Sequence, residues 1–423
     1  MATIKKILAY EILDSRGQPT IEARLITSDN RQVVTSIPAG ASVSRYEAVE
    51  IRDNDPMRFQ GLGVQTAVSI VNDLVSPKLI GVDTSRQTDV DQWLIAADGT
   101  KNKSKLGGNV VLAISQLMVK AGAMDQGLPV FYYVNKLYEQ SYKEFIRIDK
   151  IPTPIFNIIN GGKHANNTLE FQEFQIIPSS SFPFARALQL GVEIFHELKE
   201  VLLYRNANIS VGEEGGFAPN LSTNVDALEL IQETIQQRNL KPGLDVFFGI
   251  DAAANSFYKN DRYAIKDKPH PLNRDEYLEF LLSLTKSYPF LAIEDPLQED
   301  DFAAWSKFAQ ALPTNIYLIG DDLLAANKTR VSRAVKEKAC TTVLIKPNQI
   351  GTITEVLEVI QYARQCGMNY VISHRSGETN DTFIADLAVG VQADFVKFGA
   401  PSRGERVAKY NRLWQIVREE LKI

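Results

Sequence analysis

The sequence predicts an α/β barrel preceded by a smaller α+β domain. Six short apolar runs in the second half of the chain each end in a charged or ionisable residue, at steps of 23 to 43 residues that leave room for a returning helix. These end residues are Asp251, Glu294, Asp321, Lys346, His374 and Lys397. In a closed barrel the carboxyl ends of parallel strands meet at one face, where catalytic groups collect. We therefore expect the six side chains to converge.

The first part of the chain predicts a three-stranded antiparallel meander followed by helices. Apolar and polar residues alternate over residues 4–13, 20–27 and 32–37, with turn residues between these runs. Residues 63–127 then show helical periodicity. We place the domain boundary after residue 138, so that residues 1–138 form the N-terminal domain and residues 139–423 the barrel domain.

The barrel domain is predicted to begin irregularly. Two strand-like runs, 152–160 and 169–178, are separated only by a loop. Two helical stretches, 184–205 and 224–238, follow before strand and helix alternate strictly from about residue 246. The predicted order is therefore ββαα followed by six βα repeats, a modified TIM-like barrel.

Composition limits the class of protein. A net charge of −5 and a pI near 5.6 disfavour a nucleic-acid-binding surface. No apolar run approaches the roughly 20 residues that span a bilayer, and Glu11 and Asp14 interrupt the N-terminus before a signal-peptide core could form. Two cysteines provide no disulfide framework, so we expect a cytoplasmic protein.

The strand-end carboxylates indicate a metal site. Asp251, Glu294 and Asp321 offer hard oxygen ligands without cysteine or paired histidines, a set that favours magnesium or manganese over zinc. Separate salt bridges, or helix capping by each polar residue, are the alternative interpretations.

The strand-end lysines indicate acid–base chemistry. A lysine near a metal and a second ammonium has its pKa lowered and can act as a general base. Such a base suits the removal of a proton next to a carboxylate. A snorkelling surface lysine is the alternative, but the three apolar residues directly before Lys346 disfavour it.

Longer motifs resemble those of the enolase family. They are D-S-R-G-Q-P-T (14–20), N-I-I-N-G-G-K-H-A (157–165), F-Q-E-F (171–174), V-G-E-E-G-G-F-A-P-N (211–220), L-I-K-P-N-Q-I-G (344–351) and V-I-S-H-R-S-G-E-T (371–379). They occur in the family's order, and the resemblance continues to V-A-K-Y-N (407–411), so it covers essentially the whole chain.

The resemblance implies a lyase that interconverts 2-phosphoglycerate and phosphoenolpyruvate in glycolysis and gluconeogenesis. It implies these roles for the reacting groups: Lys346 removes the C2 proton, Lys397 pairs with the substrate carboxylate, and Glu214 protonates the departing hydroxide with Glu173 close by. The remaining substrate contacts are implied for Arg375 and Ser376, which bind the phosphate, and for Gln172, His164 and the pocket histidine His374.

The resemblance also implies two magnesium ions. Asp251, Glu294 and Asp321 hold the first, and Ser42 holds the second when its loop closes. Two residues near these sites depart from the family pattern: Ser44 replaces a glycine and Glu213 an aspartate.

A homodimer is expected from the same resemblance. An interface arginine of the family is replaced by Gln415, whereas its glutamate partner is kept as Glu22. Two alternatives to enolase activity stay open. The chain could be a superfamily relative acting on another carboxylate substrate, or a catalytically idle homologue that serves as a binding or structural protein.

Overall fold

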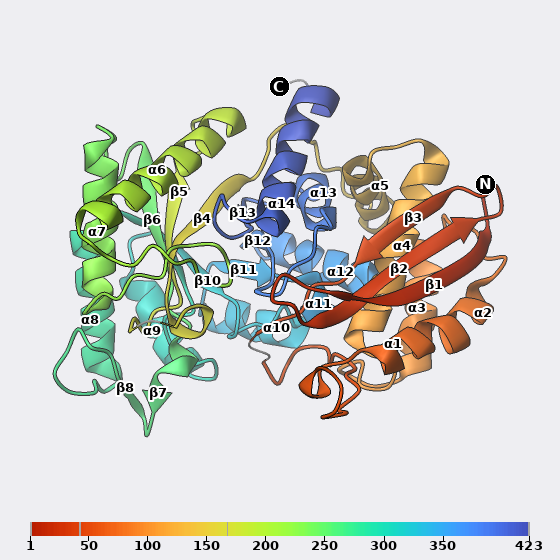
Figure 1. The fold of residues 1–423 in the computed structure, drawn as a ribbon, viewed down its shortest axis with the longest axis horizontal. Coiled ribbons are helices and arrows are strands. Elements are labelled where there is room, and N and C mark those ends of the chain that lie inside the picture. Colours follow the sequence, from red (N-terminus) through yellow and green to blue (C-terminus); the bar gives the residue numbers. More distant parts are fainter. Residues whose placement is uncertain (1, 42–43, 167, 422–423) are drawn as a thin grey trace. The chain divides into compact units, whose positions relative to one another are not determined.

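The computed structural model describes residues 2–41, 44–166 and 168–421 (Figure 1). The chain forms two compact units. Unit 1 comprises Met1–Lys150, Ile345–Gln365 and Ile372–Ala393, and unit 2 comprises Ile151–Leu344, Cys366–Val371 and Asp394–Ile423.

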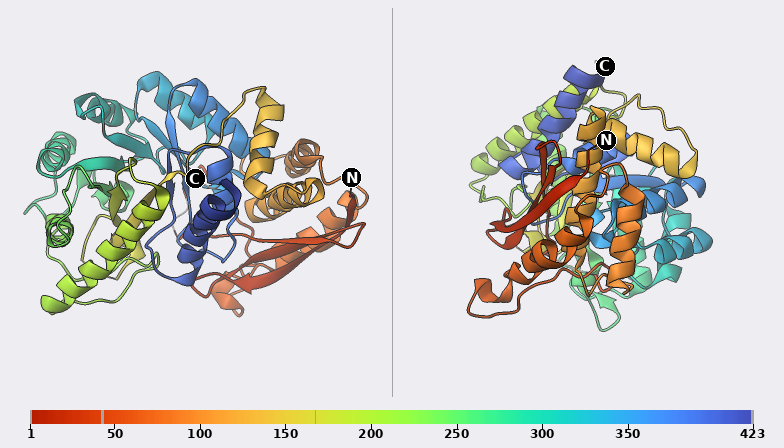
Figure 2. Two further views of the ribbon diagram at one scale, coloured as in Figure 1. Left: turned by 90° about the horizontal axis from the view of Figure 1, so that it is seen from above. Right: turned by 90° about the vertical axis from the view of Figure 1, so that its right-hand side faces the viewer.

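Unit 1 begins with the predicted antiparallel meander of β1 (Ile4–Leu13), β2 (Pro19–Thr27) and β3 (Gln32–Ser36). Alternate residues of β2 face inward: Ile21, Ala23 and Leu25 are fully buried. The sheet packs on helix α4 (Gly108–Gln126), so its strands cover one side of the helices of this unit (Figure 2). The meander prediction is confirmed.

Helices fill the rest of unit 1. A helical stretch over Gln65–Leu79, with a π-helical middle at Ile70–Val75, precedes α3 (Gln87–Asp98), α4 and α5 (Val130–Tyr142). Left-handed glycines, Gly99 and Gly127, end α3 and α4. The unit also contains α11 (Pro347–Ile350), α12 (Ile353–Gln365) and α13 (Phe383–Gly390). Helix α5 runs past residue 138, and the domain boundary placed there stays a prediction.

Eight strands form a closed barrel. In chain order they are β4 (Thr153–Asn160), β5 (Glu173–Pro178), β6 (Val246–Asp251), β9 (Phe290–Glu294), β10 (Tyr317–Gly320), β11 (Thr342–Ile345), β12 (Asn369–Ser373) and β13 (Phe395–Lys397). Helices α6 (Phe184–Tyr204) and α7 (Asn224–Gln237) separate β5 from β6, which confirms the irregular opening. Strand β5 runs antiparallel to both of its neighbours, β4 and β6.

Helices follow the later barrel strands of unit 2, and a small hairpin of β7 (Tyr258–Lys259) and β8 (Arg262–Tyr263) follows β6. These helices are α8 (Arg274–Ser287), α9 (Phe302–Ala311), α10 (Lys328–Glu337) and α14 (Gly404–Gln415). Capping boxes begin α7 and α8 through Thr223 with Asp226 and Asn273 with Glu276.

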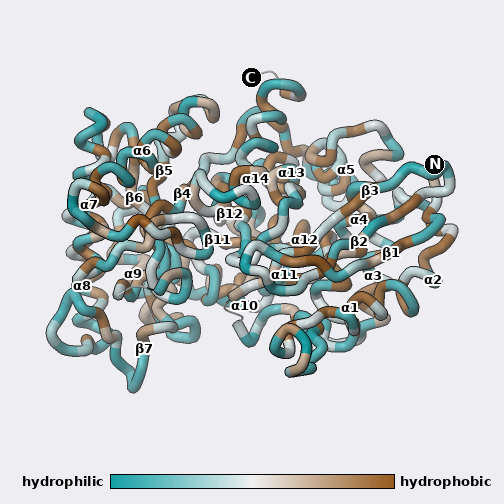
Figure 3. Tube along the Cα trace, viewed as in Figure 1, coloured by the Kyte–Doolittle hydropathy of each residue, from teal (hydrophilic) through white to brown (hydrophobic). Residues whose placement is uncertain are grey.

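The barrel interior of unit 2 is apolar below the strand ends. Its core cluster consists of Ile155, Ile177, Ala292, Ile319, Leu344, Val371 and Phe395, each from a different strand. Figure 3 shows the matching hydrophobic stretches along β4 to β6. Among the helices of the described residues, none has the length and apolar character needed to cross a bilayer.

Candidate active site

The strand register of unit 2 places three acidic residues side by side. Glu173 pairs with Asp251, and Asp251 pairs with Glu294. Asp251 and Glu294 are the last residues of β6 and β9, whereas Glu173 is the first residue of β5. Because β5 is antiparallel, its beginning lies at the carboxyl ends of its neighbours. Nearly complete burial of all three side chains makes this row costly without a cation.

Lys397, the last residue of β13, supplies that positive charge. Its Nζ donates to Glu294 Oε1 and Oε2 at 2.8 and 2.7 Å and to Glu173 Oε1 at 3.2 Å, and it lies 3.6 Å from Asp251 Oδ2. Burial alone lowers the pKa of Lys397, but the surrounding carboxylates outweigh it and raise the pKa well above its ordinary value. The surrounding carboxylates therefore favour the charged form of this side chain.

Glu173 also belongs to a second group, with Glu214 and His164. His164 Nδ1 lies 3.5 Å from Glu214 Oε1 and 3.9 Å from Glu173 Oε1. Burial, followed by the charge of Glu214, raises the pKa of Glu173 well above its ordinary value, although Lys397 opposes the shift. Two carboxyl groups this close and this buried favour holding a proton between them.

Buried amides orient the two glutamates. Gln175 Nε2 donates to Glu173 Oε2 at 2.8 Å, and Asn157 Nδ2 donates to Glu214 Oε2 at 2.9 Å. Gln172 Nε2 donates to Asp251 Oδ2 at 3.1 Å. These contacts keep the carboxylate oxygens in fixed directions, as a site for acid–base chemistry requires.

The segment that carries Glu214 is a tight turn. Gly215 has a φ of +89°, and a Cβ on Gly216 would lie 2.8 Å from Asn160 Oδ1 and 3.0 Å from the backbone of Ile158. Glu213 N donates to His164 O at 3.0 Å and thereby fastens the turn to the His164 segment. Gly215 is required by its positive φ, and Gly216 by the close approach to β4.

Asp321 belongs to an acidic cluster with Asp295 and Asp322. Ligand oxygens of these three residues lie within 4.8 Å of one another. Asp295 is buried, and it accepts the backbone N–H groups of Asp321 at 3.0 Å and of Asp322 at 2.6 Å. Burial, then the charges of Asp322 and Asp321, raise the pKa of Asp295 well above its ordinary value. The structure thus brings Asp251 and Glu294 together around Lys397 and positions Asp321 through Asp295.

Unit 1 carries the other predicted site residues. Lys346 directly follows β11 and is half-buried, whereas His374, Arg375 and Ser376 follow β12 and are buried. Arg375 Nη1 donates to Glu47 Oε2 at 2.8 Å, and Ser376 Oγ accepts the N–H of Ala41 at 2.7 Å. Ser42 lies outside the described residues, between Ala41 and Ser44.

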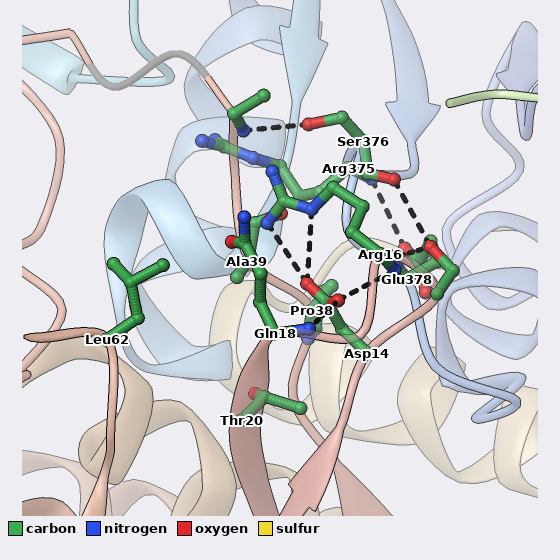
Figure 4. A network of polar contacts seen from close by, with 12 residues as sticks. Asp14, Arg16, Gln18, Thr20, Pro38, Ala39, Leu62, Arg375, Ser376 and Glu378 are labelled. Carbon is green, nitrogen blue, oxygen red and sulfur yellow. Dashed lines mark hydrogen bonds and ion pairs between the residues drawn. The ribbon is translucent and has the colours of Figure 1, made fainter. Parts of the chain in front are cut away.

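The 14–20 motif supports this Arg375–Ser376 segment. Asp14 accepts the N–H groups of Arg16 and Gln18, and the Arg16 guanidinium pairs with Asp14 and donates to Ala39 O at 3.2 Å (Figure 4). Ala39 and Gly377 exchange backbone hydrogen bonds of 2.8 and 2.9 Å. The motif therefore fixes the backbone beside Arg375.

Sequence reasoning missed several residues of the site. They are Glu47, Asn157, Gln175, Asp295 and Asp322. Two carried a signal: Gln175 follows Glu173 with the two-residue period of one strand face, and Asp295 follows the strand-end Glu294. Nothing in the pattern singles out Glu47.

The fold and the site define an acid–base enzyme of the α/β-barrel class. The defining features are a closed barrel with an irregular ββαα opening, an acidic row around a lysine, and a buried group of glutamates and a histidine. Comparison with known proteins identifies one family for both parts of the chain. Residues 4–134 match the N-terminal domain model of enolase, and residues 149–422 match the enolase C-terminal TIM-barrel domain model. The chain is 43% identical over 417 residues to an enolase of Ehrlichia canis (strain Jake), covering 99% of this chain and 96% of that protein.

The chain therefore belongs to the enolase family. Membership confirms the predicted fold and the expectation of a lyase, phosphopyruvate hydratase.

Proposed function

We propose that this chain catalyses the reversible, magnesium-dependent dehydration of 2-phosphoglycerate to phosphoenolpyruvate. The observation that carries the proposal is the buried row of Glu173, Asp251 and Glu294 around Lys397. Charges buried in this way are rarely the best arrangement for stability alone, and they are common where a cation and an anionic substrate bind.

The donor set fits magnesium. Asp251, Glu294 and Asp321 provide only carboxylate oxygens, the ligands that this ion prefers. We propose that they hold the first ion, and that Ser42 contributes to a second. Bound magnesium would supply positive charge that stabilises the negative charge developing on the substrate carboxylate.

The chain's own residues then divide the proton transfers. Lys346 follows β11, which pairs with β10 in the barrel, and we assign it the removal of the C2 proton. The Lys397 ammonium binds the substrate carboxylate. Because the raised pKa of Glu173 keeps a proton in the Glu173–Glu214 pair, Glu214 can donate one to the hydroxide leaving C3.

Other residues bind and orient the substrate. We assign the phosphate to Arg375 and Ser376, since a guanidinium offers several donors in a planar fork. His164 lies beside Glu214, the proposed acid for the leaving group, and Gln172 donates to Asp251. We assign to the buried His374 the role of shaping the pocket. The activity would place the protein in cytoplasmic glycolysis and gluconeogenesis, and a net charge of −5 supports a small-molecule substrate over a nucleic acid.

An absorbance assay tests the proposal. Purified protein incubated with 2-phosphoglycerate and magnesium is expected to accumulate phosphoenolpyruvate, and chelation by EDTA is expected to stop the reaction until magnesium is restored. Turnover of another carboxylate substrate in place of 2-phosphoglycerate would favour the superfamily relative. A folded protein that binds magnesium but turns over neither would favour the idle homologue.

Gly40→Ala is expected to raise the KM for 2-phosphoglycerate about 10-fold. A Cβ at position 40 would overlap the Arg375 guanidinium, so the guanidinium must move. Gly404→Ala is the matched control, since a Cβ there meets nothing within 4 Å. A KM for Gly40→Ala equal to that of the control would contradict the assignment of the phosphate to Arg375.

We further propose that the protein is a homodimer. A groove of about 280 Å³ in unit 2 lies between α6 and α14 and is lined by Leu188, Val192, Val407, Tyr410 and Trp414 among others. Trp414 is 40% exposed there. An apolar groove with an exposed tryptophan is typical of a protein–protein interface, and a second copy of the chain is the proposed occupant.

Trp414→Glu is expected to convert the dimer to a monomer, because it introduces a charge into this apolar groove. Sedimentation velocity of the wild type and the variant measures the change. Tyr204→Glu provides the control, since Tyr204 is 88% exposed and does not line the groove. A wild type that sediments as a monomer would overturn the dimer proposal.

A further inference from the structure

We propose that Glu47 is a positioning residue that holds the phosphate-binding Arg375 in place and ties it to the backbone at Ser44. The inference rests on the proposed function, because it needs Arg375 to bind the substrate phosphate. All of the residues that carry it belong to unit 1.

The two oxygens of the Glu47 carboxylate have different partners. Oε2 accepts from Arg375 Nη1 at 2.8 Å, and Oε1 accepts from the backbone N–H of Ser44 at 2.9 Å. Both side chains of the ion pair are 4% exposed. At that burial an ion pair with defined geometry holds its partners in place, and its loss leaves an uncompensated charge.

The segment before Ser42 contacts the same arginine. Gly40 lies so close to the guanidinium that a Cβ would overlap it, and Ala41 N donates to Ser376 Oγ at 2.7 Å. Arg375 and Ser376 therefore engage the chain on the near side of Ser42, and Glu47 engages it on the far side through Ser44. The Arg375 guanidinium and its Glu47 partner therefore contact the backbone at Gly40 and at Ser44.

The chemistry of the carboxylate is specific to this task. A glutamine at position 47 could still accept the Ser44 N–H, but its amide could not neutralise Arg375. An aspartate would keep the charge but is one methylene shorter, so it could not reach both partners without moving the backbone. Loss of a residue that orients a metal ligand typically costs about 10- to 100-fold in metal affinity or activity, and we expect an effect of that order on phosphate affinity here.

Competitive inhibition by inorganic phosphate provides the test, because it reports on the phosphate site without the chemical step. We expect Glu47→Gln to raise the inhibition constant for phosphate and the KM for 2-phosphoglycerate by about 10-fold or more, with a much smaller change in kcat. Glu50→Gln is the matched control: Glu50 pairs with Arg52 at 2.9 Å in the same stretch of chain.

A double-mutant cycle separates positioning from general damage. In an Arg375→Gln background the further change Glu47→Gln should not weaken phosphate inhibition any further, since the guanidinium that Glu47 positions is gone. It also removes a carboxylate left without its cation, so any remaining change should be toward tighter phosphate binding. An equal effect in both backgrounds would overturn the inference, as would wild-type phosphate affinity in Glu47→Gln. If Glu47→Gln does not fold, Glu47→Asp decides: a several-fold weaker phosphate affinity supports the inference and an unchanged one refutes it.

The result is separable from the proposed function. A wild type without activity and without phosphate inhibition would remove the proposed function itself. An active wild type whose phosphate affinity is indifferent to position 47 would remove only the role of Glu47.

Discussion

Lys346→Ala is expected to lower the rate of hydrogen exchange at C2 of 2-phosphoglycerate by roughly 10²- to 10⁴-fold or to abolish it. Exchange with solvent deuterium, followed by NMR, isolates proton removal from the loss of hydroxide. Magnesium affinity should stay close to that of the wild type, because the proposed ligands Asp251, Glu294 and Asp321 are intact. Calorimetric titration of magnesium measures this second expectation.

The control for this variant is Lys336→Ala, which removes an exposed lysine in the last turn of α10. It should exchange the C2 hydrogen at the wild-type rate. Exchange in Lys346→Ala close to that of the control would show that the base is another residue. Lys397 is the alternative strand-end lysine, but the carboxylates around it raise its pKa and so favour its protonated form.

The sequence predicted the strands and their order better than their directions. Continuous apolar runs identify buried strands, and the spacing between the runs requires helices. These two patterns are sufficient to predict the ββαα opening and the later βα repeats. The run of β5, E-F-Q-I-I-P, is buried at every position, so its pattern reads the same in either direction. Only tertiary pairing makes it antiparallel, and that pairing brings Glu173 beside Asp251.

Convergence of the strand ends was predictable only in part. Asp251, Glu294 and Lys397 meet in unit 2 because each ends its strand. Asp321 lies one residue beyond β10, and there a side chain outside the strand pattern, Asp295, determines its backbone position. Local periodicity carries no information about a side chain that hydrogen-bonds the amides of a neighbouring strand end.

Contacts from loops were the least predictable part of the site. The position of Glu214 depends on a glycine turn packed against β4, and Arg375 depends on Glu47, more than 300 residues earlier in the sequence. Such pairs leave no spacing that a single sequence reveals. The family resemblance located Glu214 and Arg375, but it did not indicate their supporting partners.

Lys397→Met is expected to destabilise the protein by about 3–5 kcal/mol at neutral pH without magnesium. Methionine has similar length but no charge, so the buried carboxylates of Asp251 and Glu294 would lose the cation between them. The contribution of the lysine is fully present below its unfolded pKa of 10.5 and is lost only as the pH rises through its higher folded value, so it acts throughout the neutral range. Denaturant unfolding with and without the substitution measures the loss.

The pH dependence distinguishes this mechanism from a simple loss of packing. Without the ammonium, the folded pKa of Glu173 should rise further above its unfolded value of 4.5, so the variant's stability falls as the pH increases from about 4.5 through that folded value. Magnesium should restore part of the stability lost by Lys397→Met, because a cation among the same carboxylates binds only the folded state. Lys103→Met is the control: it removes a lysine that pairs with Glu355. Its loss of stability should be smaller than that of Lys397→Met and should not depend on magnesium. If both variants respond to pH and magnesium alike, the acidic row does not depend on Lys397 for its charge balance.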